Sequence, residues 1–256
     1  MTTRRLEMAA LAGLPIVRRG DAIGSLVIEA LQRESRVLKQ QDVIVVAQKI
    51  ISKAEGRVVA LDSVTPGELA REWAGKTQKD PRLVELILSE SKRVVRHRPG
   101  VLIVEHRLGF VMANAGVDQS NAGPAGQGEH AILLPVDPDE SAERLRAEVF
   151  AATGTDVAVV INDSFGRPWR RGTMGIAIGA AGLPVILDLR GQPDMFGREL
   201  AVSISGFADE IAAGASLVMG QGAEGQPVVI VSGLVWSEPA TTARELVRPE
   251  AEDLFR

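Results

Sequence analysis

Two aspartates stand among short polar residues where apolar segments end. Asp118 lies in the segment 113–121 (Ala-Asn-Ala-Gly-Val-Asp-Gln-Ser-Asn), and Asp163 follows the apolar run 157–161. Carboxylates from separate loops, with a neighbouring hydroxyl such as that of Ser164, are ligands that Mg²⁺ or Mn²⁺ prefers. The alternative is that both are turn or capping residues, because Asp often ends a strand. We interpret the pair as a candidate site for a divalent metal.

A glycine-rich segment near the end of the chain could bind phosphate. Gly220, Gly222 and Gly225 have the G-x-G-x-x-G spacing of dinucleotide-binding folds. That motif should open a helix, but Pro227 and the apolar run 228–231 follow it, which disfavours a dinucleotide-dependent oxidoreductase. A glycine-rich turn still lets backbone N–H groups approach phosphate oxygens. The alternative is an ordinary hairpin turn.

Basic side chains follow two of the apolar runs. Lys49 and Lys53 come after the run 42–47 and could contact phosphate, or they could be solvated surface lysines. Arg167 and Arg170 follow Asp163 closely. A guanidinium can hold a carboxylate through two hydrogen bonds. These two arginines are our candidates for binding a substrate carboxylate, and the alternative is structural pairing with acidic side chains.

Composition narrows the function classes. The 256 residues include no cysteine and three histidines that lack metal-ligand spacing, so oxygen atoms are the expected metal ligands. A net charge of −4, an aromatic content of 4% and the absence of tyrosine argue against nucleic-acid binding. No apolar stretch reaches the ~18–20 residues of a membrane span, and the N-terminus does not resemble a secretory signal. We expect a cytoplasmic enzyme without a membrane partner.

The elements that position these residues follow from hydrophobic periodicity and capping residues. Helices and strands mix without regular βαβ alternation, so we predict an α+β fold with mixed sheets, one unit in all and a candidate hinge at 135–138. Asp118 and Asp163 are expected in loops, and 114–129 is read as loop throughout. Strand-length or extended segments are expected at 11–17, 42–47, 101–104, 109–112, 157–161, 185–187, 202–204 and 228–231. Helices are expected after Asp21, Thr65 and Asp80, from Ser141 to Gly154, and over 208–215.

Taken together, these segments resemble the coenzyme F(420)-0:gamma-glutamyl ligase family over roughly residues 13–234. The resemblance implies an α+β fold that forms an intertwined homodimer. It also implies an amide ligase whose small-molecule partners are GTP, L-glutamate and a deazaflavin acceptor, with Mg²⁺ or Mn²⁺ as cofactor and K⁺ as a further candidate. The segments that carry the resemblance are 13–17 (Gly-Leu-Pro-Ile-Val), 52–56, 113–121, 162–170, 188–191, 196–200 and 208–213 followed by Met219 and Gly220.

The resemblance also implies roles for individual residues. The implied metal ligands are Asp118, Asp163, Ser164 and Gln221. The implied nucleotide-binding residues are Leu14, Pro15, Ile16, Val17, Gln48, Lys49, Lys53, Asn121, Met219, Gly220, Gln221, Gly222, Ala223, Glu224, Gly225 and Gln226. No general base is evident, and an acyl phosphate needs mainly an oriented amine.

Several residues depart from the family pattern. Ser164 stands where threonine is usual, and this change keeps the hydroxyl. Ser232 stands where arginine is typical, which we expect to remove a positive charge near the glycine-rich turn. The loop 122–130 is longer and richer in glycine than expected. Two alternatives therefore stay open: a paralogue that joins an amino acid to a different carboxylate, and a nucleotide-binding regulatory protein.

Overall fold

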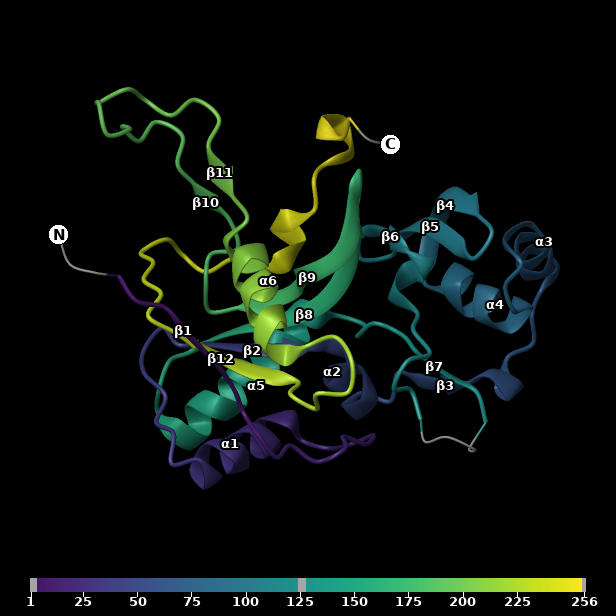
Figure 1. The fold of residues 1–256 in the computed structure, drawn as a ribbon, viewed down its shortest axis with the longest axis horizontal. Helices are drawn as coiled ribbons and strands as arrows, with labels where there is room; N and C mark the ends of the chain where they lie inside the picture. The colour runs from purple at the N-terminus through teal and green to yellow at the C-terminus, as the bar shows by residue number, and fades with distance from the viewer. Residues whose placement is uncertain (1–3, 124–127, 255–256) are drawn as a thin grey trace.

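The fold is built on a mixed five-stranded sheet (Figure 1). A computed structural model describes residues 4–123 and 128–254. The strands, in spatial order, are β1 (Glu7–Ala10), β12 (Val228–Ser232), β2 (Val43–Ala47), β8 (Ala158–Arg167) and β9 (Arg170–Ala181). Strands β2 and β8 run parallel, and the other neighbours are antiparallel. This mixed architecture agrees with the irregular order of elements along the sequence.

Helices cover both faces of this sheet. Because successive side chains of a strand point to opposite faces, β2 contributes to two cores. Ile44 and Val46 pack with α1 (Ile23–Arg33) and α5 (Pro138–Thr153), while Val43 and Val45 pack with α6 (Phe207–Met219). Burial on both faces explains why β2 is apolar at consecutive positions instead of alternating.

A smaller layer with its own core lies beside the main sheet (Figure 1). Its helices α3 (Glu68–Thr77) and α4 (Pro81–Ser89) pack against the sheet of β4 (Ser91–Arg98), β5 (Val101–His106) and β6 (Val111–Ala113). The remaining elements are α2 (Gln48–Ala54), the pairs β3 (Val58–Ala60) with β7 (His130–Ile132) and β10 (Leu187–Asp188) with β11 (Ile204–Ser205), and the 3₁₀ turns η1 (Leu61–Ser63), η2 (Asn114–Gly116), η3 (Ala243–Leu246) and η4 (Glu250–Glu252).

Several element predictions are wrong in their bounds. Residues 11–17, interpreted as an extended entry segment, lie outside any regular element, and strand β1 directly before them was not predicted. The helix predicted from Ser141 begins at Pro138, because Asp137 caps it by accepting a hydrogen bond from the Glu140 amide. Within the segment read as loop, the structure has η2 after β6, and residues 124–127 lie outside the described part.

The largest correction concerns the strand predicted at 157–161. Strand β8 continues to Arg167, so Asp163 and Ser164 lie in a strand and not in a loop. They pair with Ile176 and Gly175 of β9. The outer half of this hairpin carries polar residues that leave no apolar alternation in the sequence. No helix in the described ranges 4–123 and 128–254 is long and apolar enough to cross a membrane.

A buried carboxylate joins the smaller layer to the segment between α2 and β3. Glu90 is 5% exposed, and its oxygens lie 2.8 Å from Arg57 Nη2 and 2.7 Å from Arg107 Nη2. His106 Nε2 lies 3.6 Å from the same carboxylate. Burial raises the pKa of Glu90, but the nearby His106 ring and the hydrogen bonds from Arg107 and Arg57 outweigh it and hold the pKa at about 2.

We expect Glu90→Gln to lower the free energy of unfolding at neutral pH by about 3 kcal/mol, because it leaves two arginines facing an uncharged group. The carboxylate's pKa is lower in the folded state, so its stabilisation is present above about 4.5 and is lost as the pH falls towards 2. The difference between the variant and the wild type should therefore shrink over that interval in urea unfolding. The control Glu72→Gln breaks only the exposed pair with Lys76 and should cost under about 1 kcal/mol. Equal losses in the two variants would contradict this account.

Candidate functional site

The chemically important segments meet at one end of the main sheet, where the central strand β2 finishes beside β8. We call this end of the strands the sheet edge. Ala47 lies opposite Asn162 in the parallel pair β2–β8, so Gln48, the first residue after β2, lies beside Asp163 in the continuing strand β8. The Ala47 amide donates a hydrogen bond of 2.8 Å to the Pro227 carbonyl, which brings the start of β12 to the same edge. Carboxyl ends of parallel strands are the usual location of ligand sites in α/β sheets.

Helix α2 begins directly at this edge. Gln48 is 2% exposed, accepts a hydrogen bond of 2.9 Å from Ser52 Oγ and hydrogen-bonds Asp163. The buried Gln48 side chain therefore helps to orient the Asp163 carboxylate. Lys49 and Lys53 lie one turn apart on the helix, and burial together with the charge of Lys49 lowers the pKa of Lys53. The two lysines form a local positive region beside the carboxylates.

Asp118 enters the site from the segment that follows η2. Its backbone is fixed by two hydrogen bonds with Ile132, of 3.1 and 2.7 Å. Lys49 Nζ lies 2.6 Å from Asp118 Oδ2 and 2.6 Å from Ser120 Oγ. Ser120 also donates both its amide and its hydroxyl to Asp118, at 2.8 Å each. Asp118 thus reaches the sheet edge through an ion pair with the helix that follows β2.

The Asp163 carboxyl is influenced by the charges of both Lys49 and Asp118. Burial, the largest effect, and the charge of the Asp118 carboxylate raise the pKa of Asp163 to about 6, although the Ser164 amide, Lys49 and Gln48 act in the opposite direction. The single positive charge of Lys49 therefore balances only part of the negative charge of the two carboxylates. A divalent cation would relieve the remaining repulsion.

Two neutral oxygen groups complete the candidate metal site. Ser164, next to Asp163, donates a hydrogen bond of 2.7 Å to Gln221 Oε1. Two carboxylates, a hydroxyl and an amide carbonyl make an all-oxygen donor set that fits Mg²⁺ or Mn²⁺. Among the described residues there is no group of three or more His, Cys, Asp or Glu side chains arranged to hold a metal. The fit therefore depends on the two neutral oxygens as well as on the aspartates.

The glycine-rich turn connects α6 to β12, so the hairpin alternative is wrong. Gly220 ends the helix with φ +73°. The turn's backbone N–H groups face an anion already: the Gly222 amide donates a hydrogen bond of 2.8 Å to Glu224 Oε2. The amides of Glu224, Gly222 and Gln221 together lower the pKa of the Glu224 carboxyl. An internal carboxylate thus occupies the position expected for phosphate.

The N-terminal segment reaches the same edge from β1. The Leu11 amide donates a hydrogen bond of 2.9 Å to the Val228 carbonyl. Beyond it, Leu14 is half-buried and Val17 is in the core, whereas Pro15 and Ile16 are exposed and line a hollow of about 520 Å³ beside the start of α1. Only these two offer accessible side chains to a ligand.

The other predicted nucleotide residues differ in accessibility. Met219 is 7% exposed and packs in the core under the turn. Asn121 is exposed next to Ser120 and has φ +56°. Residues 221–226 are all exposed.

Arg167 and Arg170 lie away from the aspartates. They pair with each other at the tip of the β8–β9 hairpin, and Arg167 Nη2 donates to the Arg171 carbonyl. Four residues of strand separate Arg167 from Asp163, about 13 Å. The structure therefore does not bring these arginines together with the carboxylate pair.

Ser232 corrects another expectation. It lies at the far end of β12, opposite Glu7, four residues or about 13 Å from the end that meets the turn. The departure from arginine at this position therefore does not change the charge next to the glycine-rich turn.

The sequence analysis also missed Ser120, although a serine two residues after an aspartate is a typical partner in an Asx turn.

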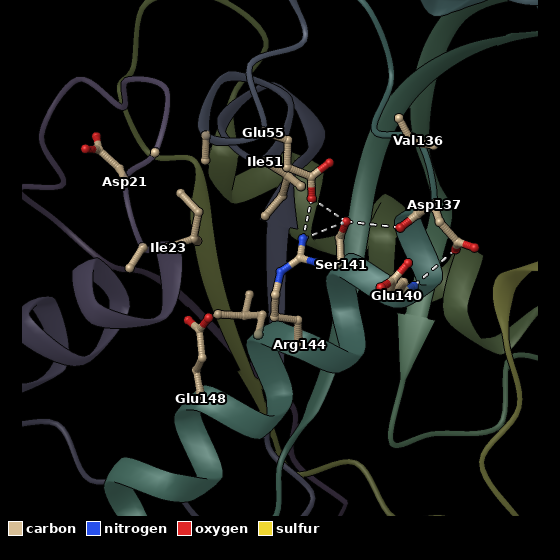
Figure 2. Close-up of a pocket in the computed structure, with 14 residues that line it drawn as sticks. Asp21, Ile23, Ile51, Glu55, Val136, Asp137, Glu140, Ser141, Arg144 and Glu148 are labelled. Carbon is tan, nitrogen blue, oxygen red and sulfur yellow. Dashed lines mark hydrogen bonds and ion pairs between the residues drawn. The ribbon is translucent and has the colours of Figure 1, made fainter.

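A separate cavity of about 450 Å³ lies on the opposite side of α2, between α1 and α5 (Figure 2). Glu55 Oε1 accepts hydrogen bonds of 2.5 Å from Ser141 Oγ and from Arg144 Nη2 at its wall. None of the predicted site residues lines it. The cavity is therefore distinct from the aspartate pair.

Comparisons with known proteins agree over nearly the whole chain. The model of the family described as F420-0:Gamma-glutamyl ligase matches residues 13–233. A Methanopyrus kandleri protein named coenzyme F420:L-glutamate ligase is 44% identical over 244 residues, which cover 94% of this chain and 93% of the relative. Proteins of the same name from Methanothermobacter thermautotrophicus and Methanocaldococcus jannaschii are 43% and 42% identical, covering 98% and 99% of this chain and 99% and 98% of the relatives.

Proposed function

The chain belongs to the F420-0:gamma-glutamyl ligase family, and from that premise we propose that it joins L-glutamate to the terminal carboxylate of coenzyme F420-0, with GTP as phosphoryl donor. The observation that carries the proposal is the pairing of Asp118 and Asp163 beside Lys49, at the sheet edge that the glycine-rich turn also reaches. Phosphoryl transfer needs charge neutralisation and positioning more than a covalent nucleophile, and this edge supplies both.

The proposed reaction has two steps. A carboxylate oxygen of the acceptor attacks the γ-phosphorus, the bond from that phosphorus to the β–γ bridging oxygen breaks, and GDP leaves. The glutamate amine, after losing a proton, then attacks the acyl carbon, and inorganic phosphate departs with the carboxylate oxygen it gained. No side chain needs to form a covalent intermediate.

The residues of the sheet edge have separate tasks in this proposal. Asp118, Asp163, Ser164 and Gln221 would hold Mg²⁺ or Mn²⁺, which supplies neutralisation of phosphate charge when bound. Lys49 and Lys53 add positive charge, and the amides of residues 221–224 bind phosphate oxygens. A phosphate on these amides must displace the Glu224 carboxylate. Gln48 keeps the Asp163 carboxylate oriented.

A coupled assay tests the proposal. The protein is incubated with GTP, Mn²⁺, L-glutamate and the acceptor, and each reactant is omitted in turn. We expect GDP only when acceptor and glutamate are both present, together with an acceptor heavier by one glutamyl residue. Acceptor labelled with ¹⁸O in its carboxylate should transfer one ¹⁸O to the released phosphate. Nucleotide binding without turnover would contradict the proposal and favour a regulatory protein; turnover only with another acid would favour a paralogous ligase.

We further propose that the protein forms a homodimer through a projecting arm. Residues 189–203, between β10 and β11, extend away from the body of the fold (Figure 1). Met195 and Phe196 on this arm are 95% and 94% exposed. Large apolar side chains gathered on an extended segment are typical of a surface that another protein covers. A second copy is the occupant that the family resemblance implies.

Phe196→Asp should weaken the dimer by at least about 30-fold, because a buried aromatic anchor is replaced by a charge. Sedimentation velocity over a range of concentrations measures this change. The matched control is Val37→Asp, an 81%-exposed apolar residue away from the arm, which should leave the association unchanged. A Phe196→Asp protein that associates as tightly as the wild type would remove the arm from the interface.

A further inference from the structure

Asn162 is a buried polar residue that the proposed chemistry does not use. It precedes Asp163 in β8 and is 6% exposed. Because side chains alternate along a strand, it continues the face of β8 that packs against α6, away from Asp163. Its Nδ2 donates hydrogen bonds to Ser216 Oγ at 3.1 Å and to Met219 Sδ at 3.5 Å. Asn162 thus ties the strand of the metal site to the last turn of α6.

The Asn162 amide oxygen has no hydrogen-bond partner among the described residues. A buried acceptor without a partner is destabilising, and an apolar side chain of similar volume would avoid the cost. The preceding residues on the same face, Ala158 and Val160, are apolar and fully buried. Packing alone therefore favours an apolar residue here, and the amide needs another explanation.

The end of α6 is also held from β9. A Cβ atom on Gly175 would lie 2.2 Å from Ser216 Oγ, 2.4 Å from the Ala212 carbonyl and 2.6 Å from Asn162 Oδ1. Only glycine allows this close approach of β9 to the helix. Ser216 Oγ in turn donates a hydrogen bond of 3.0 Å to Ala212 O. The last turns of α6 therefore have a closely defined position over β8 and β9 (Figure 1).

This position determines where the glycine-rich turn begins. Met219 is the last residue of α6, and Gln221, two residues later, accepts the hydrogen bond from Ser164. Strand β8 therefore contacts α6 through Asn162 and the turn through Ser164, the two residues that flank Asp163 in the sequence. We propose that Asn162 is a positioning residue that sets the distance between the phosphate-binding turn and the Asp163 carboxylate. The proposal rests on the function inferred above.

The test substitutes Asn162→Leu, which keeps the volume and removes both hydrogen bonds. A positioning role predicts that the Kd of GDP with Mg²⁺, measured by calorimetry, rises about tenfold and that the KM for GTP rises in parallel. The kcat at saturating GTP should change less than threefold, and the melting temperature should not fall, because the unpartnered carbonyl is gone. A structural role would instead lower the melting temperature and leave the Kd unchanged.

Two further variants separate the possible outcomes. Ser216→Ala removes one of the two acceptors of the Asn162 amide and should raise the Kd by a smaller factor, about threefold. Val160→Ala removes packing on the same face without touching the hydrogen bonds, so it should lower stability and leave the Kd unchanged. If the wild type binds GDP and Asn162→Leu binds it with the same Kd, the positioning role of Asn162 is wrong, but the proposed function is not affected. Wild-type binding of GDP without amide formation would contradict the proposed function, and the Kd comparison would still decide the role of Asn162.

Discussion

Asp163→Asn is expected to reduce the rate of amide formation by about 10²–10³-fold or more while the fold stays intact. The Asp163 carboxylate is influenced by the charges of Asp118 and Lys49 and by hydrogen bonds from Ser164 and Gln48. The amide of asparagine keeps the shape and the contact with Gln48 but carries no charge for a cation. Initial rates of product formation at saturating GTP, glutamate and Mn²⁺ measure the effect.

A matched control makes this result specific. Asp62→Asn changes an exposed aspartate in η1, and it should leave both turnover and stability unchanged. The Asp163→Asn protein should also keep its melting temperature, because removal of a half-buried charge that faces another carboxylate relieves repulsion. Wild-type turnover in Asp163→Asn would exclude Asp163 from the metal site.

Lys49→Ala is expected to raise the KM for GTP and to lower kcat, so that kcat/KM falls by about 10²-fold. The charge of Lys49 acts on both aspartates: its Nζ pairs with Asp118 at 2.6 Å, and it lowers the pKa of Asp163. Loss of this ammonium removes a positive charge that would attract the phosphates, and it leaves the two carboxylates to repel each other.

The control for Lys49→Ala is Lys76→Ala, which removes an exposed lysine from α3 in the smaller layer. Its kinetic constants should match those of the wild type. An unchanged kcat/KM in Lys49→Ala would contradict the assignment of Lys49 to the nucleotide site. A loss confined to thermal stability would indicate that the ion pair with Asp118 is structural.

The sequence predicts the buried parts of the fold better than the exposed ones. Strand β2 is recognisable because its apolar residues are consecutive, and the cap-and-proline start at Asp80 correctly predicts α4, whose first amides the Asp80 side chain caps. Strand β4 is missed because its sequence, Ser-Lys-Arg-Val-Val-Arg-His-Arg, is mostly polar and has no period of two. The polar outer half of β8 is misread as loop for the same reason.

The candidate site depends on register, which a single sequence does not contain. Gln48 and Asp163 are 115 positions apart, and only the pairing of Ala47 with Asn162 brings them together. The contact between Lys49 and Asp118 depends likewise on tertiary packing. By contrast, the glycine spacing and the proline after it are enough to disfavour a dinucleotide fold, because that argument needs only local structure.

The position of a bound metal tests the central claim most directly. Crystals grown with Mn²⁺ and a non-hydrolysable GTP analogue would give an anomalous scattering peak at the metal. We predict a peak bounded by carboxylate oxygens of Asp118 and Asp163, with the phosphates between the metal and the turn at residues 220–225. A peak elsewhere, for example among the acidic residues of the cavity beside Glu55 and Glu148, with none between the two aspartates, would contradict the account.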